Sequence, residues 1–588
     1  MRILLLVSAF DGLAQRAWCA LRAAGHDVGV LIQPTASPSA TAAVVDGVRA
    51  AQPELIIGTN LTDPVPAEVC RAWPAVVLQH GPAGDRGPDP LGRAIIAGVP
   101  VWGVTAVQAV AEPGAGPVWA SRTFPMPATP PRKSSLYHGP VADAAMQCLA
   151  EVVAKAADPA FWPAPAPVVP AASAGAAPPE HLIDWAGTTE QIVRRVRAAD
   201  GRPGVRALVA GLAVQAYDAH AGLARGARPG EIISRRQGAV LIGTGDGSVW
   251  LGQLRSGGVK LPATTLLGRR LRGVPHSVLP AASEAESPGA YRQVRYRRSG
   301  AVGWLAFDFY NGAMSAGHCR RLLAGFRYAA AQDTTVLVLR GGTDTFSNGI
   351  HLTVIDAADD PAASAWATIK ALNAVCKEII TCTRQVVIAA YAGRAAGGGA
   401  MLGLGADLVA ARDQIVLNPY YDIGLYGSEL HTYTLPRRVG PAAAQRLIDD
   451  KLPVTAAGAA SLGLIDEVGP RHPDAYADWL TELAASYADP ATARRRRAAK
   501  AKRLLGERLP LDVYEARELA ETSRDVFADR SGFTAARQAA VHRSRPPNTP
   551  ARLLLGVPAE EAPAPVPIVK NRAADTSPAV RPPVPLSA

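Results

Sequence analysis

The chain has 588 residues, which is too long for one ordinary domain and predicts two to four domains. Hydrophobic residues make up 48% and charged residues 19%, a balance that excludes a disordered chain and is typical of globular domains with large cores. The formal net charge of +11 does not indicate a nucleic-acid-binding protein, because the arginines are spread along the chain and no basic segment is interleaved with aromatic residues.

The longest apolar runs have the length of a strand and are interrupted by Gly, Pro or charged residues, so the sequence predicts no membrane span. The apolar run at residues 3–7 is too short for a signal peptide, and we expect a cytoplasmic protein. The six cysteines form no CxxC pair and none of the Cys/His spacings of a zinc site. We therefore expect reduced cysteines and no metal ion.

Residues 1–157 alternate segments typical of strands and helices. The apolar strands RILLLV (2–7) and DVGVLI (27–32) flank a helical segment, and a second helical segment precedes ELII (54–57). This order predicts an α/β domain with an open, mainly parallel sheet, whose ligand site lies at the carboxyl ends of the strands. The first strand is not followed by GxGxxG, so a nicotinamide or flavin site is not expected.

Two polar segments follow later strands of this domain, QHGPAGDRGP (79–88) and EPGAGPVWAS (112–121). They resemble the folate-dependent formyltransferases, in which a strand ends in Asn-x-His and is followed by an Arg-Gly turn. The resemblance implies a catalytic role for His80 and binding of N10-formyl-tetrahydrofolate. It also places four further residues at this site: Arg86, Gly87, Gln108 and Glu112.

The match to the formyltransferases is incomplete. Leu78 stands where the family has Asn, and Gly114 stands where it has Asp. His80 has the chemistry of a general acid or base, whereas a lone histidine in a Gly/Pro turn is more often a hydrogen-bonded loop residue. Two interpretations therefore remain at this point, a working formyl-transfer site and one that has lost its activity.

Residues 158–181 are rich in Pro and Ala and predict a semi-rigid linker. The segment IDWAGTTEQIVRRVRAADGRPGV (183–205) resembles the start of the small C-terminal domain of the formyltransferases. Short strands and Gly turns follow it, so we expect a small β-barrel-like domain over residues 182–280.

A third α/β domain is predicted over residues 292–550. Two apolar strands, TVLVL (335–339) and VVIAAY (386–391), are each followed by a Gly-rich turn. The second turn contains glycines 397–399 and leads into a helix, so its N–H groups are unobstructed and lie at the positive end of the helix dipole. One such turn is more often a packing turn than a catalytic one, whereas two that face each other make an oxyanion hole.

The order of these turns resembles the crotonase superfamily of enoyl-CoA hydratases and isomerases. The resemblance implies that the N–H groups of Ile350 and Gly398 donate to the thioester oxygen of a CoA substrate. It also implies CoA-binding roles for four residues of the two turns: Ser347, Gly349, Gly397 and Gly399. The two catalytic glutamates of the hydratases fall on Met401 and Tyr421, and because a Met side chain cannot transfer a proton, ordinary hydration is not expected.

The block NPYYDIGLYGSELHTYTLPRRVG (418–440), which ordinary hydratases lack, supplies the remaining polar candidates: Tyr420, Tyr421, Tyr426, Ser428, Glu429 and His431. Tyr421 and Glu429 are the predicted catalytic pair, although tyrosines in such loops are also common packing residues. A helical extension follows over residues 471–548, and its basic run at 494–497 is either a solvated face or a phosphate contact. The Pro/Ala-rich tail at 560–588 is predicted to be disordered.

A formyltransferase-like domain joined to a crotonase-like domain resembles the HypX/HoxX family of [NiFe]-hydrogenase maturation proteins. The resemblance implies formyl transfer from N10-formyl-tetrahydrofolate to CoA, followed by cleavage of formyl-CoA to CO and CoA, with hydrogenase maturation proteins as partners. In this scheme the N–H groups of Ile350 and Gly398 hold the formyl oxygen, Glu429 accepts the formyl proton, and Tyr421 donates to the departing sulfur. Two alternatives remain open: an ordinary acyl-CoA hydratase or isomerase, and a non-catalytic scaffold that binds folate and CoA.

Overall fold

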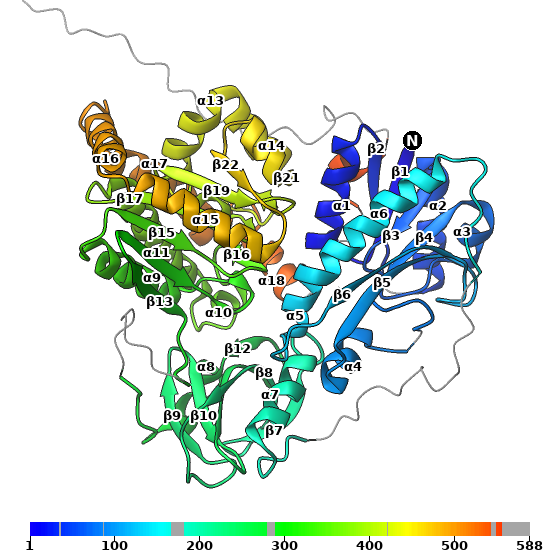
Figure 1. The fold of residues 1–588 in the computed structure, drawn as a ribbon, viewed down its shortest axis with the longest axis horizontal. Helices are drawn as coiled ribbons and strands as arrows, with labels where there is room; N and C mark the ends of the chain where they lie inside the picture. The colour runs from blue at the N-terminus through cyan, green and yellow to red at the C-terminus, as the bar shows by residue number, and fades with distance from the viewer. Residues whose placement is uncertain are drawn as a thin grey trace, which may run out of the picture.

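The computed structural model of the chain describes residues 1–34, 37–85, 87–165, 182–278, 289–419, 422–542 and 549–555. Three units meet at one junction (Figure 1): an N-terminal α/β unit, a small β unit and a larger C-terminal α/β unit. The predicted multidomain α/β fold class is therefore confirmed. Within these ranges no helix combines the length and the apolar character that a membrane crossing requires.

The N-terminal unit is built on a six-stranded sheet in the order β2-β1-β3-β4-β5-β6. The first four strands are parallel, and β5 and β6 add an antiparallel hairpin. Residues Ile3 to Val7 of β1 are at most 2% exposed, as expected for a parallel strand covered on both faces. The strands are β1 (Arg2–Val7), β2 (Asp27–Ile32), β3 (Leu55–Gly58), β4 (Ala75–Gln79), β5 (Val101–Gln108) and β6 (Val118–Pro125). The helices are α1 (Gly12–Ala23), α2 (Pro38–Ala51), α3 (Ala67–Ala72), α4 (Pro90–Ala97), α5 (Lys133–Leu136), η1 (Tyr137–Val141) and α6 (Ala142–Ala156).

The small unit contains an antiparallel sheet in the order β7-β8-β11-β10-β9, with β12 paired to β11. Helix α7 (Thr189–Ala198) begins at a capping box, in which the Thr188 hydroxyl accepts the Gln191 N–H and the Gln191 side chain accepts the Thr188 N–H. Ile192 and Val196 of α7 then pack into the core of the sheet. The strands are β7 (Val205–Val209), β8 (Leu212–Gly222), β9 (Ile232–Arg236), β10 (Ala239–Gly243), β11 (Ser248–Arg255) and β12 (Lys260–Pro262), and α8 (Ala263–Leu267) and η3 (Gly268–Leu271) follow.

The C-terminal unit has two sheets, a larger one in the order β13-β14-β15-β17-β19-β22 and a smaller one in the order β16-β18-β20-β21. The larger sheet is parallel from β14 onward. Its strands are β13 (Val294–Ser299), β14 (Val302–Phe307), β15 (Val336–Arg340), β17 (Val386–Tyr391), β19 (Leu408–Arg412) and β22 (Glu467–Gly469). The smaller sheet contains β16 (Thr345–Ser347), β18 (Arg394–Ala396), β20 (Val416–Asn418) and β21 (Val454–Thr455). The helices among them are η4 (Tyr310–Gly312), α9 (Ala316–Ala330), α10 (Leu352–Asp356), α11 (Pro361–Thr381), α12 (Gly398–Met401), α13 (His431–Asp450) and α14 (Ala456–Ser461).

A helical extension packs against this unit and consists of α15 (Pro473–Tyr487), α16 (Pro490–Leu505), α17 (Leu511–Phe527) and α18 (Phe533–His542). Beyond it, η5 (Ala551–Leu553) lies against β2, so the last described segment returns to the N-terminal unit (Figure 1). The predicted tail at 560–588 lies outside the described residues. Among those residues no group of three or more His, Cys, Asp and Glu side chains is arranged to hold a metal ion.

Candidate active site

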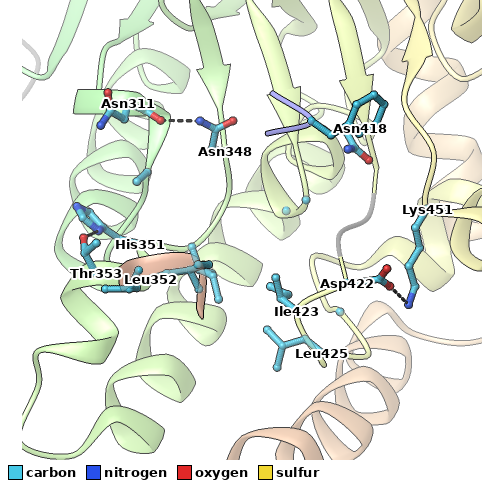
Figure 2. A pocket seen from close by; sticks show the side chains of 18 of the residues that line it. Asn311, Asn348, His351, Leu352, Thr353, Asn418, Asp422, Ile423, Leu425 and Lys451 are labelled. Atoms are coloured by element: carbon cyan, nitrogen blue, oxygen red, sulfur yellow. Dashed lines mark hydrogen bonds and ion pairs between the residues drawn. The ribbon is translucent and has the colours of Figure 1, made fainter. Parts of the chain in front are cut away.

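A cavity of about 870 Å³ lies where the three units meet. This volume is in the upper part of the range of roughly 300–1,000 Å³ that is usual for small-molecule sites. All three units contribute to its lining, among others with Phe10, Gln15, Arg202, Lys260, Ile350, Gly398 and Glu429. Figure 2 shows Asn311 and Asn348 on one side of the cavity, where the Asn348 amide donates to the Asn311 carbonyl oxygen at 2.7 Å. Asp422 and Lys451 form an ion pair of 2.6 Å on the other side.

Two backbone N–H groups in the cavity wall are available to a ligand. The Met314 N–H donates to the Gly349 oxygen at 2.8 Å and the His351 N–H donates to the Met314 oxygen at 3.0 Å, which leaves the Ile350 N–H on the opposite side of this parallel bridge. Gly398 is the first residue of α12, where an N–H has no partner within the helix. Neither N–H has a hydrogen-bond partner among the described residues. A Cβ on Gly349 would lie 3.0 Å from the Gly398 nitrogen, so the two turns adjoin as an oxyanion hole requires.

The Glu429 carboxyl group lies beside this pair of donors, since its Oε1 would be 2.5 Å from a Cβ on Gly398. Glu429 and Leu430 have φ values of 64° and 57°, in the left-handed region that residues other than glycine rarely adopt. Burial raises the pKa of Glu429 to about 7; the Ser428 N–H, which donates to Oε2 at 3.0 Å, opposes this shift, and the nearby charge of Glu518 adds to it. A carboxyl group with a pKa near 7 is suited to accept a proton at neutral pH.

Cationic side chains from separate segments also line the cavity: Arg202, Arg255, Lys260, Lys451 and Arg552. Lys451 and Arg552 both pair with Asp422, whereas the Lys260 ammonium donates to the Tyr310 hydroxyl at 2.8 Å. Guanidinium and ammonium groups are the usual protein contacts of phosphate, so this lining fits a phosphate-bearing ligand such as CoA. Sequence reasoning missed these five residues because no motif marks them and they lie far apart along the chain.

Of the other residues predicted in the two turns, one lines the cavity and three lie behind its wall. Gly397 lines the cavity together with Gly398, and the apolar side chain of Met401 is also in its wall. Ser347 is fully buried behind the first turn, where its hydroxyl donates to the Gly312 oxygen at 3.1 Å and accepts the Gly349 N–H at 3.1 Å. A Cβ on Gly399 would collide with the Ser347 backbone. Ser347, Gly349 and Gly399 therefore shape the turns rather than line the cavity.

Among the polar candidates of residues 418–440, some line the cavity and others lie behind its wall or outside the described residues. Tyr420 and Tyr421 lie outside the described residues, so the predicted role of Tyr421 stays a prediction. Ser428 lines the cavity, and its hydroxyl is buried with no hydrogen-bond partner in the described part of the chain. Tyr426 and His431 lie behind the lining with their rings 5.5 Å apart, and the His431 Nδ1 donates to the Ser428 oxygen at 2.7 Å.

The predicted formyl-transfer residues lie in the N-terminal unit and not in the lining of this cavity. The His80 ring meets the Tyr137 ring edge-on, with 5.1 Å between centroids. In the described chain the buried Nε2 of His80 has no hydrogen-bond partner, and burial lowers the pKa of this ring. A neutral imidazole with an unpartnered nitrogen fits a proton-transfer role. Asp11, which sequence reasoning did not single out, accepts the Tyr137 hydroxyl at 2.8 Å, and its charge opposes the effect of burial on the His80 pKa.

Three further residues predicted for the folate site are described: Gly87 after β4, Gln108 at the end of β5, and Glu112 between β5 and β6. The Gly87 N–H donates to Asp85 at 3.1 Å, and the Gln108 side chain accepts the Trp119 indole N–H at 3.5 Å. Glu112 is exposed in the turn of the hairpin. Arg86 lies outside the described residues.

The two departures from the formyltransferase pattern are in structurally different places. Leu78 is 3% exposed and packs in the core of the N-terminal unit. Gly114 has a φ of 74° in the hairpin turn, a conformation that favours glycine. Leu78 thus fills with an apolar side chain the position at which the formyltransferases have Asn.

Comparisons with known proteins match the small unit, the C-terminal unit and most of the chain. The formyl transferase C-terminal domain family matches residues 177–270, and the enoyl-CoA hydratase/isomerase family matches residues 310–518. The hydrogenase maturation factor HoxX of Bradyrhizobium diazoefficiens is 37% identical over 94% of this chain and 96% of its own length. A methionyl-tRNA formyltransferase of Dechloromonas aromatica is 31% identical over 31% of this chain and 58% of its own length. The crystal structure of HypX from Aquifex aeolicus in complex with tetrahydrofolic acid superposes with a TM-score of 0.88 at 34% identity, covering 94% of this chain and 98% of that one.

Proposed function

The chain belongs to the HypX/HoxX family of hydrogenase maturation factors, and from this premise we propose that it makes carbon monoxide in two steps. A formyl group first passes from N10-formyl-tetrahydrofolate to the thiol of CoA, and the resulting formyl-CoA then splits into CO and CoA. Folate and CoA are both substrates in this scheme. The CO is proposed to become a ligand of the [NiFe] site, with hydrogenase maturation proteins as the partners that use it.

In the first step the CoA sulfur attacks the formyl carbon, the bond between that carbon and N10 breaks, and the thiol proton ends on N10. We assign this proton transfer to His80, because its buried, unpartnered Nε2 belongs to a ring that is neutral at pH 7. The proposed folate contacts are Arg86, Gly87, Gln108 and Glu112. Binding of tetrahydrofolic acid by the related HypX of Aquifex aeolicus supports a folate site in this family.

In the second step Glu429 accepts the formyl proton, the carbon–sulfur bond breaks to release CO, and the proton passes to the sulfur. The N–H groups of Ile350 and Gly398 polarise the formyl oxygen, which makes the formyl C–H more acidic. Tyr421 is proposed to relay this proton: its hydroxyl donates to the departing sulfur and receives the proton held by Glu429 in return. The net reaction consumes no further reactant, since the proton that leaves carbon restores the thiol of CoA.

The observation that carries this proposal is the position of the Glu429 carboxyl group against Gly398, in a cavity that also holds the Ile350 N–H. A base that titrates near neutral pH thus lies beside the two donors that would hold the formyl oxygen. The cationic lining supports CoA as the carrier, because its phosphates need partners of opposite charge.

The test is CO release from the purified full-length protein, detected with haemoglobin, when 10-formyl-tetrahydrofolate is supplied with and without CoA. CO that appears only with both substrates is the expected result. If formyl-CoA alone gives CO and the folate does not, the first step is wrong for this chain and the second stands. If neither gives CO, the proposal is wrong and a non-catalytic scaffold is the better interpretation.

An ordinary hydratase is tested in the same preparation with crotonyl-CoA. We expect no hydration, because Met401 in the cavity wall cannot hold or move a proton. Hydration at a rate comparable with CO release would instead favour the hydratase interpretation.

A further inference from the structure

One face of helix α17 contacts the turn that carries Glu429. Glu518, Thr522 and Asp525 are each fully buried, and their spacing of four and three residues places them on the same side of the helix. Charged side chains are rarely buried so completely unless they are paired or hydrogen-bonded. The hydrogen-bond partners of these three side chains therefore show what the buried face of α17 holds in place.

All three side chains bind the backbone of residues 426–432. The two oxygens of Glu518 accept separate donors: Oε2 accepts the Leu430 N–H at 2.9 Å, and Oε1 accepts the Thr432 N–H at 2.7 Å and the Thr432 hydroxyl at 2.6 Å. The Thr522 hydroxyl donates to the Gly427 oxygen at 2.9 Å, and Asp525 accepts the Tyr426 N–H at 2.7 Å. The helix thus holds the backbone on both sides of Glu429.

The turn needs this support because its conformation is unfavourable by itself. Glu429 and Leu430 both have positive φ, a conformation that costs of order 1 kcal/mol or more for each residue and persists only when its surroundings fix it. A second helix also fixes the turn, since the Asn373 side chain of α11 accepts the Glu429 N–H at 2.8 Å. Glu518 does not line the cavity, so it acts on the site through the turn and through its charge, and not by contact with a ligand.

We propose that Glu518 is a positioning residue for decarbonylation, which fixes the 426–432 turn so that the Glu429 carboxyl group stays beside Gly398. This inference rests on the proposed role of Glu429 as the base. A Gln at position 518 has one acceptor oxygen in place of two, so at least one of the Leu430 and Thr432 contacts is lost. A displacement of the base by about 1 Å is enough to reduce a rate up to a hundredfold.

Glu518 also affects the charge state of Glu429, because its negative charge raises the Glu429 pKa. Two thiols in the described chain also feel the charge of Glu429: burial raises the pKa of Cys319 to about 12 and that of Cys376 well above its ordinary value. Both thiols are neutral where Glu429 titrates. His431 lies 3.5 Å from Glu518 and remains next to it when position 518 is changed.

The experiment measures CO release from formyl-CoA by Glu518→Gln across a pH series. We expect the plateau rate to fall by about tenfold to a hundredfold. We also expect the midpoint of the acidic limb to move to lower pH, because loss of a neighbouring negative charge makes Glu429 a stronger acid. Thr522→Val should lower the plateau less and leave the midpoint unchanged, since it removes one contact and no charge.

The matched control is Glu515→Gln, on the same helix one turn earlier. Glu515 pairs with Lys377 at 3.3 Å, and no hydrogen bond joins it to the turn in the described chain, so plateau and midpoint should stay at the wild-type values. Hydrogen exchange of the Leu430 and Thr432 amides gives a readout that needs no activity, and we expect faster exchange in Glu518→Gln than in Glu515→Gln.

The inference is overturned if Glu518→Gln folds and retains the wild-type plateau, midpoint and amide exchange. Should Glu518→Gln fail to fold, a folded Thr522→Val with an unchanged plateau would overturn it. If the wild type releases no CO from formyl-CoA, the proposed function fails instead. The amide exchange then decides alone whether Glu518 holds the turn.

Discussion

Burial makes the Glu429 carboxyl group a weaker acid than an exposed glutamate, and the same burial links its protonation state to the stability of the fold. Its pKa is raised from an ordinary value of 4.5 to about 7. A group whose pKa is higher in the folded state stabilises the fold when protonated, and this contribution is lost as the pH rises through the folded-state pKa. The ionised form that accepts a proton is therefore also the form that destabilises the fold.

Glu429→Gln should separate the effect of Glu429 on catalysis from its effect on the stability of the fold. We expect CO release from formyl-CoA to fall by about a hundredfold to ten-thousandfold, the usual contribution of a general acid–base group. In the wild type the rate should rise with pH through a midpoint near the Glu429 pKa of about 7, because the base must be ionised. CO release, followed with haemoglobin over a pH series, is the measurement.

The same variant should be more stable than the wild type above neutral pH, by up to about 3 kcal/mol, because it removes the cost of a buried charge. Below about pH 4 the difference should disappear, since the wild-type carboxyl is then protonated in both states. Urea unfolding at the two pH values checks this. Equal stability of wild type and variant at high pH would mean that Glu429 is not buried as an anion.

At the scale of whole elements, the helical extension supports the C-terminal unit from two sides. Helix α17 holds the turn of Glu429, and α16 is fixed by the buried ammonium group of Lys500. The arginines of the basic run at 494–497 do not line the cavity, and α16 lies at the end of the unit far from the N-terminal unit (Figure 1). Of the two interpretations of this run, a solvated face is the one that agrees with its place in the fold.

Lys500→Met should destabilise the C-terminal unit. Lys500 is 2% exposed and its Nζ lies 3.1 Å from Asp407 and 3.0 Å from the Ile379 oxygen, so the variant leaves a buried carboxylate without its cation. Removal of one partner of such a pair costs about 3–5 kcal/mol. The control is Lys502→Met on the exposed side of the same helix, which should change stability by less than about 0.5 kcal/mol. Urea unfolding compares the two, and equal losses would contradict the role of the ion pair.

The parts that could be predicted from the sequence are those that local chemistry determines. The strand, turn and helix around Gly397 are encoded within a few residues, and so is the start of α9, where the Ser315 hydroxyl accepts the His318 N–H. Glu518 gave no such signal, because a glutamate in an amphipathic helix usually faces solvent. Its burial depends on a turn 88 residues away in the chain. The positive φ at Glu429 is likewise a result of tertiary contacts, not of its residue type.

At the scale of the whole molecule, the last described segment joins the C-terminal and N-terminal units. The Thr549 hydroxyl accepts the Ile32 N–H at 3.0 Å at the end of β2, and Arg552 pairs with Asp422 of the C-terminal unit. Leu553 is 4% exposed and belongs to the core of the N-terminal unit. The cavity is lined by both units and by this segment, so its shape depends on their association.

Leu553→Ala should weaken this association, because truncation of a buried leucine costs about 2–5 kcal/mol. The adjacent Leu554 is 39% exposed, so Leu554→Ala is a matched control and should cost less than about 0.5 kcal/mol. Limited proteolysis under native conditions reads the difference, since cleavage within or next to residues 549–555 requires the segment to leave the N-terminal unit. We expect faster cleavage there in Leu553→Ala than in Leu554→Ala or the wild type. Equal rates in the two variants would show that Leu553 contributes nothing to the junction that forms the cavity, and that other contacts such as those of Thr549 and Leu555 hold the segment.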